Sequence, residues 1–339
     1  MAYTTIDDPA KHFNTVIYTG NGSTQSITGV GFQPDWTWTK KRNGTTGHRW
    51  VDAVRGVTKA IFSNGSNAES TESNGLTAFA SDGYSLGTDG NYNSNGDNYA
   101  SWNWKANGQG SSNTDGSINT TYTSANTTAG FSISKYTGTG SNATVGHGLG
   151  VAPKMIMVKC TSEVQDWFVY HTGIGTNALR LNGNGASEGG VWNSTAPTNS
   201  VFSIGTAQAV NKNYGTYVAY CFAEKLGYSK FGTYEGNGNA DGTFVYTGFK
   251  PAFVLVKRYD GAGLSWRFFD SKRNSNGDRE FMYANLTDAE SGGDNMDFLS
   301  NGFKSRNTSG HQNGNSDDYI YMAFGQSLVG SNNVPATAR

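Results

Sequence analysis

The sequence predicts an all-β protein made of three repeated antiparallel β-sandwich modules. Two observations carry this prediction. A set of landmark residues recurs three times in the same order along the 339 residues, and apolar residues inside each copy alternate with a period of two. The composition agrees with it, because 13% aromatic residues and 46 glycines suit short strands joined by tight turns.

Each copy has a proline near its start and a tyrosine near its end. The prolines are Pro34, Pro153 and Pro251, and the tyrosines are Tyr99, Tyr217 and Tyr319. The proline-to-tyrosine distances of 65, 64 and 68 residues are nearly constant, although the copies share little identity. A tryptophan follows the proline after 16, 14 and 15 residues, in turn Trp50, Trp167 and Trp266. Each proline is expected to begin a strand, because the first residue of a strand need not donate to the ladder.

The strand that follows each proline has two distinguishable faces. The second and fourth residues after the proline are large and apolar in all copies: Trp36/Trp38, Met155/Met157 and Phe253/Leu255. The opposite face carries Thr37 and Thr39 in the first copy, so we expect water there. In the other two copies it carries aliphatic residues, so we expect it to be covered. Tryptophans in strands are expected to fill the interior of the individual sandwiches.

The copies define the expected domains. Residues 1–107 form the first sandwich with an N-terminal arm, residues 131–228 the second, and residues 229–339 the third with a C-terminal tail. Roughly six short strands fit into each copy. Residues 108–130 are rich in Gly, Ser, Thr and Asn, which predicts a flexible linker and a hinged first module. The second and third copies have no such spacer and are expected to be rigidly coupled.

Charge and hydropathy exclude several classes of partner. The net charge of −1 without a long basic run argues against nucleic acid. No apolar run reaches the roughly 18 residues of a membrane helix, and the N-terminus lacks the apolar core of a signal peptide. We therefore expect no membrane contact and synthesis in a cytoplasm. The histidines show no metal-ligand spacing, and no catalytic motif is present, so neither a metal site nor an enzyme is expected.

Two Asp-x-x-Arg pairs follow the tryptophan in the first and third copies. They are Asp52 with Arg55 and Asp270 with Arg273, whereas the second copy has no such pair. Either they bind a polar ligand or they form ion pairs that fix a turn. We favour the structural ion pair, because buried charges need partners in any case.

The segment Asp89–Asp97, DGNYNSNGD, is the candidate binding loop. Tyr92 offers a ring for stacking on a sugar, and Asn95 and Asp97 offer hydrogen bonds to hydroxyls. Its oxygen-bearing residues also allow calcium, but the segment lacks the register of an EF-hand and a bidentate glutamate. Asn, Asp and Gly are common in turns, so a turn explains this segment without a metal ion. No cofactor is therefore expected.

Several motifs together resemble a known family. AYTTIDDP at Ala2–Pro9, then YTGNGS, GFQPDWTWTKKR, VDAVRG and the final NNVPATAR are similar to marine bacteriophage virion proteins, tail-fibre and structural, with repeated GF.PD.vwiK.R modules. The resemblance spans nearly the whole chain. The second copy departs most from the pattern. The family's modules are described as concanavalin-like or lectin-like β-sandwiches.

The resemblance implies a structural protein of the virion, made in the cytoplasm of the host bacterium. It implies a tail-fibre or host-recognition component, for which cell-surface glycan is the expected ligand. The alternative is a capsid or tail decoration or adaptor protein that grips other virion proteins. Weak single sites would gain from many linked copies, so a homo-oligomer, a trimer, is expected.

Overall fold

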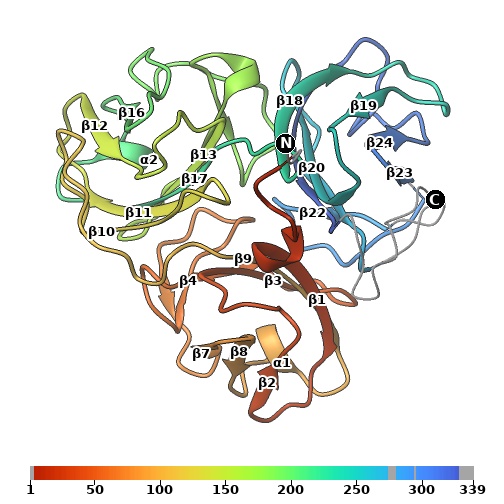
Figure 1. Cartoon of the computed structure of the whole chain (residues 1–339), viewed down its shortest axis with the longest axis horizontal. Coiled ribbons are helices and arrows are strands. Elements are labelled where there is room, and N and C mark those ends of the chain that lie inside the picture. The colour runs from red at the N-terminus through yellow and green to blue at the C-terminus, as the bar shows by residue number, and fades with distance from the viewer. Residues whose placement is uncertain (1–3, 274–279, 294, 328–339) are drawn as a thin grey trace.

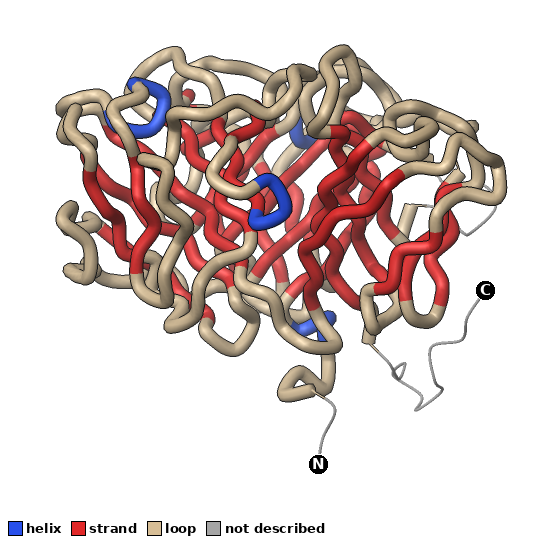
Figure 2. Tube along the Cα trace, turned by 90° about the horizontal axis from the view of Figure 1, so that it is seen from above, coloured by secondary structure: helices blue, strands red, loops and turns tan. Residues whose placement is uncertain are grey.

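The structure is a computed structural model that describes residues 4–273, 280–293 and 295–327. These residues form almost only antiparallel strands, which confirms the all-β prediction. Figure 1 shows three lobes around a common centre, one for each third of the chain. In Figure 2 the strands run across the thickness of the molecule, and loops gather at both ends.

Each lobe contains one main sheet. The first has the order β1-β9-β3-β4 (Phe13–Thr19, Asn98–Trp104, Trp36–Lys41, Arg49–Asp52). The second has the order β10-β11-β17-β13-β14-β15 (Tyr122–Asn126, Phe131–Thr137, Thr216–Phe222, Met155–Cys160, Phe168–His171, Ala178–Arg180). The third has the order β18-β25-β20-β21-β22 (Ser229–Glu235, Asp318–Gly325, Pro251–Arg258, Arg267–Asp270, Met282–Tyr283). The order β1-β9-β3-β4 thus recurs as β11-β17-β13-β14 and as β18-β25-β20-β21.

A smaller outer sheet accompanies each main sheet. These are β2-β8-β7 (Gln25–Ile27, Gly83–Leu86, Leu76–Ala80), β12-β16 (Ala143–Gly146, Val201–Ile204) and β19-β24-β23 (Phe244–Tyr246, Gly302–Ser305, Met296–Leu299). A main sheet together with its outer sheet is called a unit below. A short ladder, β5-β6 (Lys59–Ala60, Ser70–Thr71), belongs to the first unit.

Helices are short. They are α1 (Gly90–Asn93), α2 (Gln208–Asn211) and two 3₁₀ turns, η1 (Pro9–Lys11) and η2 (Thr172–Ile174). None of the helices in the described part of the chain is long and apolar enough to cross a membrane.

The prolines lie at the start of the third strand in the recurring four-strand order, in turn β3, β13 and β20. Pro34 and Pro153 stand two residues before the first residues of β3 and β13, and Pro251 is the first residue of β20. All three are buried. A proline is accommodated there because a residue at the start of a strand need not donate to the ladder.

The inner faces of the three main sheets meet in one hydrophobic cluster, here called the central core. It holds seven of the eight tryptophans, all almost completely buried: Trp36, Trp38, Trp50, Trp102, Trp104, Trp167 and Trp266. The ring of Trp36 lies 4.1 Å from that of Trp104 in its own sheet and 4.9 Å from that of Tyr220 in the second unit. The expectation that these tryptophans fill separate sandwiches is therefore wrong. They fill the space between the units.

The other face of each main sheet is covered by its outer sheet, and three smaller cores lie between them. Thr37 and Thr39 face this side of the first unit, and each is 1% exposed, so the expectation of a wet face is wrong. Alternation shows that the two faces of a strand differ, but not what covers each face. A β-branched threonine fits a covered strand as well as an exposed one.

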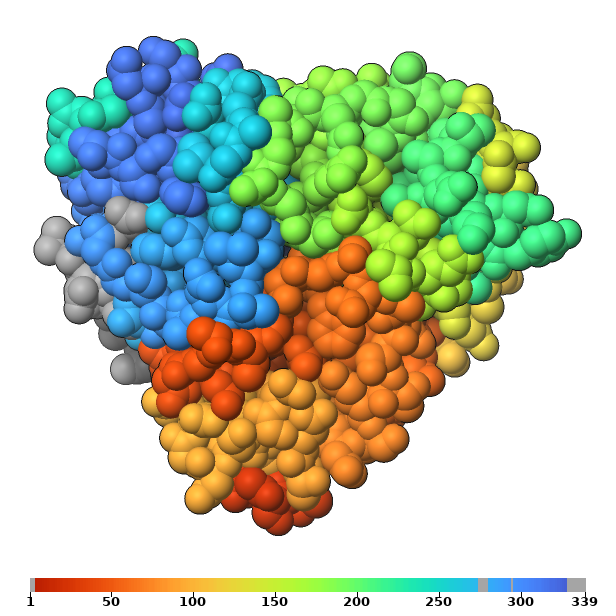
Figure 3. Space-filling model, turned by 180° about the vertical axis from the view of Figure 1, so that it is seen from behind, coloured from red at the N-terminus to blue at the C-terminus, as the bar shows by residue number. Residues whose placement is uncertain are grey.

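Residues 108–130 are not a spacer, because they are part of the second unit. They include β10, which pairs with β11 along its full length, and Ile118, which is buried in the second unit's outer core. The hinge expected for the first unit is contradicted too, since Trp50 packs on Trp167 of the second unit with ring centroids 4.7 Å apart. Figure 3 shows atoms of all three units meeting at the centre of one face.

A shared core predicts one cooperative unfolding transition, because no unit keeps its inner face buried without the others. Trp36→Ala should lower the free energy of unfolding by about 3–5 kcal/mol and shift the whole transition. Differential scanning calorimetry of the wild type and the variant checks both points. Two transitions, with only one displaced by the substitution, would instead show a first unit that unfolds independently.

Candidate functional site

Polar side chains occur at equivalent places on the three seams, the contacts between neighbouring units. The last residue of the fourth strand in the recurring order is buried and polar in every unit: Asp52 in β4, His171 in β14 and Asp270 in β21. They are equivalent because each pairs with the first large apolar residue of the third strand, in turn Trp36, Met155 and Phe253. Each of them points to a neighbouring unit.

Two of the seams join a carboxylate to a ring donor. The Tyr220 hydroxyl of the second unit donates to Asp52 Oδ2 over 2.6 Å. The indole Nε1–H of Trp102 in the first unit donates to Asp270 Oδ2 over 3.1 Å. A buried carboxylate needs such donors, since burying it unpaired costs far more than the bond gains.

The third seam explains why the second copy lacks an Asp-x-x-Arg pair. Ladder register places Met322 where the other two units have Tyr220 and Trp102. Methionine has no hydrogen to donate, so a carboxylate facing it would lack this partner. The second unit has His171 instead, whose Nε2 hydrogen-bonds the main-chain carbonyl of Tyr321 over 3.1 Å.

The arginines of both pairs bind the aspartates, as the structural interpretation supposes. Arg55 donates from its main-chain N to Asp52 Oδ1 (2.8 Å) and from Nε to Asp52 Oδ2 (2.6 Å), and it also reaches Glu69 at 3.0 Å. Arg273 makes the same two contacts with Asp270. Both guanidinium groups are almost fully buried. They have no face left open for a ligand, so these residues fix the turn after the fourth strand.

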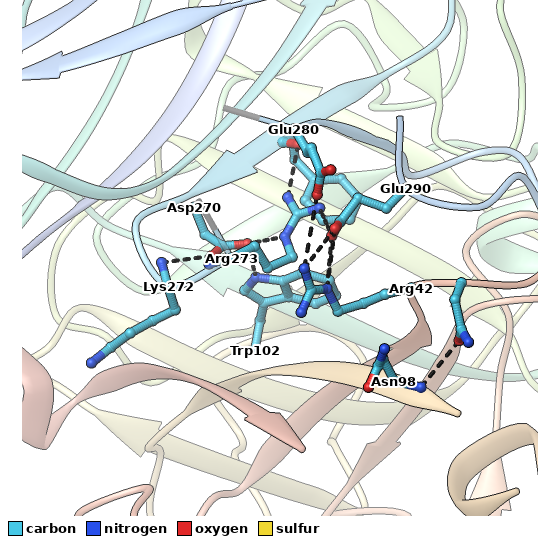
Figure 4. Close-up of polar contacts among 10 residues, drawn as sticks. Arg42, Asn98, Trp102, Asp270, Lys272, Arg273, Glu280 and Glu290 are labelled. Carbon is cyan, nitrogen blue, oxygen red and sulfur yellow. Dashed lines mark hydrogen bonds and ion pairs between the residues drawn. The ribbon is translucent and has the colours of Figure 1, made fainter. Parts of the chain in front are cut away.

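The seam between the third and first units adds a second ion-pair layer, drawn in Figure 4. Glu290 accepts from Arg273 Nη1 (2.8 Å) and from Arg42 Nη2 (2.7 Å), and Arg42 also lies 3.8 Å from Glu280. A hydrogen bond with Glu290, together with burial, raises the pKa of Glu280 to about 7. Glu280 therefore holds a proton up to near neutral pH, which removes the like-charge repulsion with Glu290.

A second set of hydrogen bonds across the seams is made by the residues four positions before Asp52, His171 and Asp270. His48 Nε2 contacts the carbonyl of Tyr283 (2.8 Å), Trp167 Nε1 donates to that of Phe62 (2.8 Å), and Trp266 Nε1 donates to that of Arg180 (2.9 Å). The equivalent of Trp167 and Trp266 is thus His48. Trp50, aligned with them from the sequence, lies two residues further on, where the other units have Val169 and Phe268.

His48 is held neutral by its surroundings. Burial lowers its pKa to about 3. The indole Nε1–H of Trp38 donates to His48 Nδ1 over 2.8 Å, so Nε2 carries the hydrogen that the Tyr283 carbonyl accepts. This ring therefore joins two units and is not available as a general base or a metal ligand.

Buried lysines occupy the sixth position after each proline: Lys40, Lys159 and Lys257. Their ammonium groups donate to main-chain carbonyls, for example Lys40 to those of Lys41 (2.7 Å) and Gly44 (2.9 Å). Burial lowers the pKa of each to about 8. These lysines cap strand ends and are not partners of the Asp-x-x-Arg carboxylates.

The candidate binding loop Asp89–Asp97 is folded against the first unit, and the expectation for Tyr92 is wrong. Tyr92 is 1% exposed, and its hydroxyl donates to Glu72 Oε2 over 2.7 Å. It has no free face for a sugar, because it belongs to α1 and its ring packs over Gly75.

The other two predicted ligand residues of this loop differ in exposure. Asn95 is exposed. Asp97 forms a 2.6 Å ion pair with Lys41, and this contact lowers the pKa of the carboxyl group. Asp89 caps α1 by accepting from Asn91 N. Both carboxylates of the segment thus have partners, and no cluster of three metal-binding side chains occurs in the described residues.

A buried asparagine pins the equivalent loop in every unit, which the sequence interpretation missed. The three are Asn93, Asn211 and Asn313, each 0% exposed. Asn211, for example, donates to the carbonyls of Ser141 (2.6 Å) and Gly205 (2.8 Å) and accepts from Thr139 N (2.8 Å). The asparagine therefore ties the opening hairpin to the loop before the closing strand.

The same contact involves a glycine two residues after a tyrosine of β1, β11 and β18, in turn Gly20, Gly138 and Gly236. A Cβ at Gly20 would lie 2.2 Å from the carbonyl oxygen of Ser94, and one at Gly138 would lie 2.4 Å from that of Lys212. Gly236 is in the same position against Gly314. The glycine recurs visibly in the sequence, and the asparagine could have been found in the same way, because it stands six residues before the closing tyrosine in every copy.

One surface differs chemically between the units, namely the outward face of the outer sheet. In the third unit it carries Phe244, 43% exposed, and Tyr246, 60% exposed, on the edge strand β19. Register puts Ser26 and Thr144 at the place of Phe244 in the other units. The signal was present in the sequence as two aromatic residues, one residue apart, where the other copies have small residues.

The seams predict a specific stability effect. Tyr220→Phe removes the hydroxyl that donates to Asp52 and should lower the free energy of unfolding by about 1.5–3 kcal/mol. Tyr228→Phe is the control, because its buried hydroxyl has no hydrogen-bond partner among the described residues, and it should be neutral or slightly stabilising. Urea denaturation measures both. Equal effects would contradict the role given to the seam bond.

The buried lysines predict a pH dependence. Between pH 8 and about 10 the unfolded chain keeps its lysines protonated while the folded chain releases these protons, so the free energy of unfolding should rise with pH. Lys159→Met should make this rise smaller, whereas the exposed Lys105→Met should leave it unchanged. Denaturation curves at several pH values measure it, and an identical slope in both variants would refute the lysine assignment.

The family comparison covers all the strands described above. The family described as a domain of unknown function, DUF7483, matches residues 8–327, from before β1 to beyond the end of β25. No curated protein matches the chain. Because the match spans nearly the whole sequence, the chain belongs to the DUF7483 family.

Proposed function

We propose that the protein is a structural component of a bacteriophage virion, in a tail fibre or another host-recognition part, and that it binds carbohydrate on the host surface. The virion assignment rests on the resemblance of the repeated motifs. The observation that carries recognition is the exposed pair Phe244 and Tyr246 on the outer sheet of the third unit. Aromatic rings with a free face are common anchors of weak, adaptable binding sites.

The proposal includes duplication of one sandwich-like module. Support comes from the recurring strand order, from the prolines at the start of β3, β13 and β20, and from the equivalent seam positions of Asp52, His171 and Asp270. After duplication, equivalent positions are free to diverge. Exposed positions diverge at the lowest cost in stability, and this makes the outer faces the place where one unit acquires a new function.

The role is that of a binding protein and not of an enzyme. The buried carboxylates of Asp52 and Asp270 are bound by arginines and by ring donors of the neighbouring unit, which suits a structural role. A shallow aromatic site should have an affinity of roughly millimolar, or about −4 kcal/mol. Adhesion then comes from many copies on the particle, as a homo-oligomer such as a trimer would supply.

One observation favours the second candidate, an adaptor or decoration protein. On the second unit Val164 is 67% exposed and Tyr214 is 83% exposed, and their two loops are joined by the Glu163–Lys212 ion pair at 2.6 Å. Such neighbouring apolar side chains suit contact with another virion protein. The two surfaces lie on different units, so they are separable by mutation.

The test uses particles that carry substitutions in this protein. Phe244→Ser with Tyr246→Thr, which gives the outer face the residue types of the first unit, should reduce adsorption to host cells several-fold while the particles assemble normally. Val164→Ser with Tyr214→Ser is the matched change on the second unit and should leave adsorption intact. Loss of the protein from particles in the second variant, with normal adsorption in the first, would replace recognition by the adaptor function.

A further inference from the structure

We propose that the outward face of the third unit's outer sheet binds the neutral pyranose ring of a hexose. The site is called the aromatic face and comprises Phe244, Tyr246, Leu299, Gly302 and Lys304, with Asp241 at its border. This inference rests on the proposed function, because it names the class of carbohydrate that the same surface takes.

Register arranges the aromatic face as two rows across three strands. Phe244, Lys304 and Asp297 form one row, and Tyr246, Gly302 and Leu299 form the other. Side chains directly opposite one another in an antiparallel ladder lie on the same face, so each row lies on a single side of the sheet. Each row begins with an aromatic residue on β19, and the second row ends with Leu299 on β23.

The middle of the second row has no side chain. A Cβ on residue 302 would lie 2.9 Å and 3.0 Å from Cε2 and Cζ of Phe244 and 2.1 Å from the carbonyl oxygen of Val245. The Phe244 ring therefore leans over Gly302, toward the position opposite Tyr246. Gly302 is therefore buried beneath this ring, and the outer face of the Phe244 ring beside Tyr246 forms a low apolar floor on which a ligand can lie.

The border of the face is charged but balanced. Asp241 Oδ1 lies 2.7 Å from Lys304 Nζ and 2.8 Å from Arg306 Nη1, and Arg306 Nε lies 2.7 Å from Asp297 Oδ2. The border thus contains two cations and two carboxylates, and its net charge is zero. The side chain of Asp241 is 73% exposed, so it remains accessible to a ligand.

These features match the chemistry of a neutral hexose. One face of a pyranose ring presents C–H groups, which pack on Phe244 and Tyr246, and its edge presents hydroxyls. Hydroxyls donate to the Asp241 carboxylate and accept from the Lys304 ammonium, both charge-assisted bonds. The carboxylate of an acidic sugar would be repelled by Asp241, and Lys304 could not compensate because it already pairs with Asp241. The balanced border therefore favours an uncharged ring.

The other units supply an internal comparison. At the place of Phe244 and Lys304 the first unit has Ser26 and Ser85, and the second has Thr144 and Ser203. These small side chains offer neither an apolar floor nor a charged border. The chain should therefore have one such site, on the third unit.

The first experiment is saturation-transfer NMR with the full chain and a panel of methyl glycosides: glucose, galactose and mannose against glucuronic acid. At least one neutral glycoside should bind, and Phe244→Ser with Tyr246→Thr should weaken it by at least about tenfold. Tyr214→Ala, which removes an exposed ring elsewhere, should leave binding unchanged. Absence of any neutral binding, undiminished binding in the double variant, or preference for the acid would each overturn the proposal.

The second experiment tests the charged border. Asp241→Asn leaves Lys304 without its carboxylate, whereas Arg306 keeps Asp297, so affinity for glucuronate should rise relative to the neutral glycosides. Asp97→Asn is the control, because it removes a similar partner from Lys41 in the first unit. It should change neither the affinity for glucuronate nor that for the neutral glycosides. An unchanged order of preference in Asp241→Asn would overturn the role of the border. Circular dichroism confirms that each variant is folded.

Failure of this inference and failure of the proposed function give different results. If the double variant loses hexose binding but particles carrying it adsorb normally, the site stands and host recognition falls. If particles lose adsorption while hexose binding by the double variant equals that of the wild type, the surface serves recognition but the hexose assignment is wrong.

Discussion

The structure depends on burial of large aromatic side chains between three sheets that cannot bury them alone. Trp36 shows why, since it contacts its own sheet through Trp104 and the second unit through Tyr220. A single unit would expose its entire inner face to water, at a cost proportional to the apolar area. The three units therefore behave as the parts of one domain, although each has a small outer core of its own.

The sequence was sufficient for the class of fold, because a period of two and repeated landmarks depend only on local geometry. The sequence did not predict which other parts of the chain cover each face of a sheet. Thr37 and Thr39 have the composition of a wet face and are buried, and residues 108–130 have the composition of a linker and contain β10. Such positions are decided by neighbours distant in sequence, about which alternation contains no information.

The candidate site was predicted less well than the fold, because burial by distant residues also decides which side chains can bind a ligand. The sequence favours Tyr92 as a ligand residue because it lies in a polar loop, but Asn93 holds this loop in place and the Tyr92 ring fills the space over Gly75. Phe244 and Tyr246, which do reach solvent, lie on a regular strand, β19. A strand held by its neighbours presents side chains with less loss of conformational entropy than a free loop, which helps a weak site.

The seams also constrain which rings identical units could form, a question that the proposed duplication raises. A ring of three copies of the first unit would be chemically complete, since that unit carries both the carboxylate of Asp52 and a donor at Trp102, the pairing that Asp270 uses. A ring of third units would set Asp270 against Met322, which has nothing to donate. A ring of three third units would therefore lack the ring donor of each seam, whereas in the observed arrangement Trp102 of the first unit supplies it to Asp270.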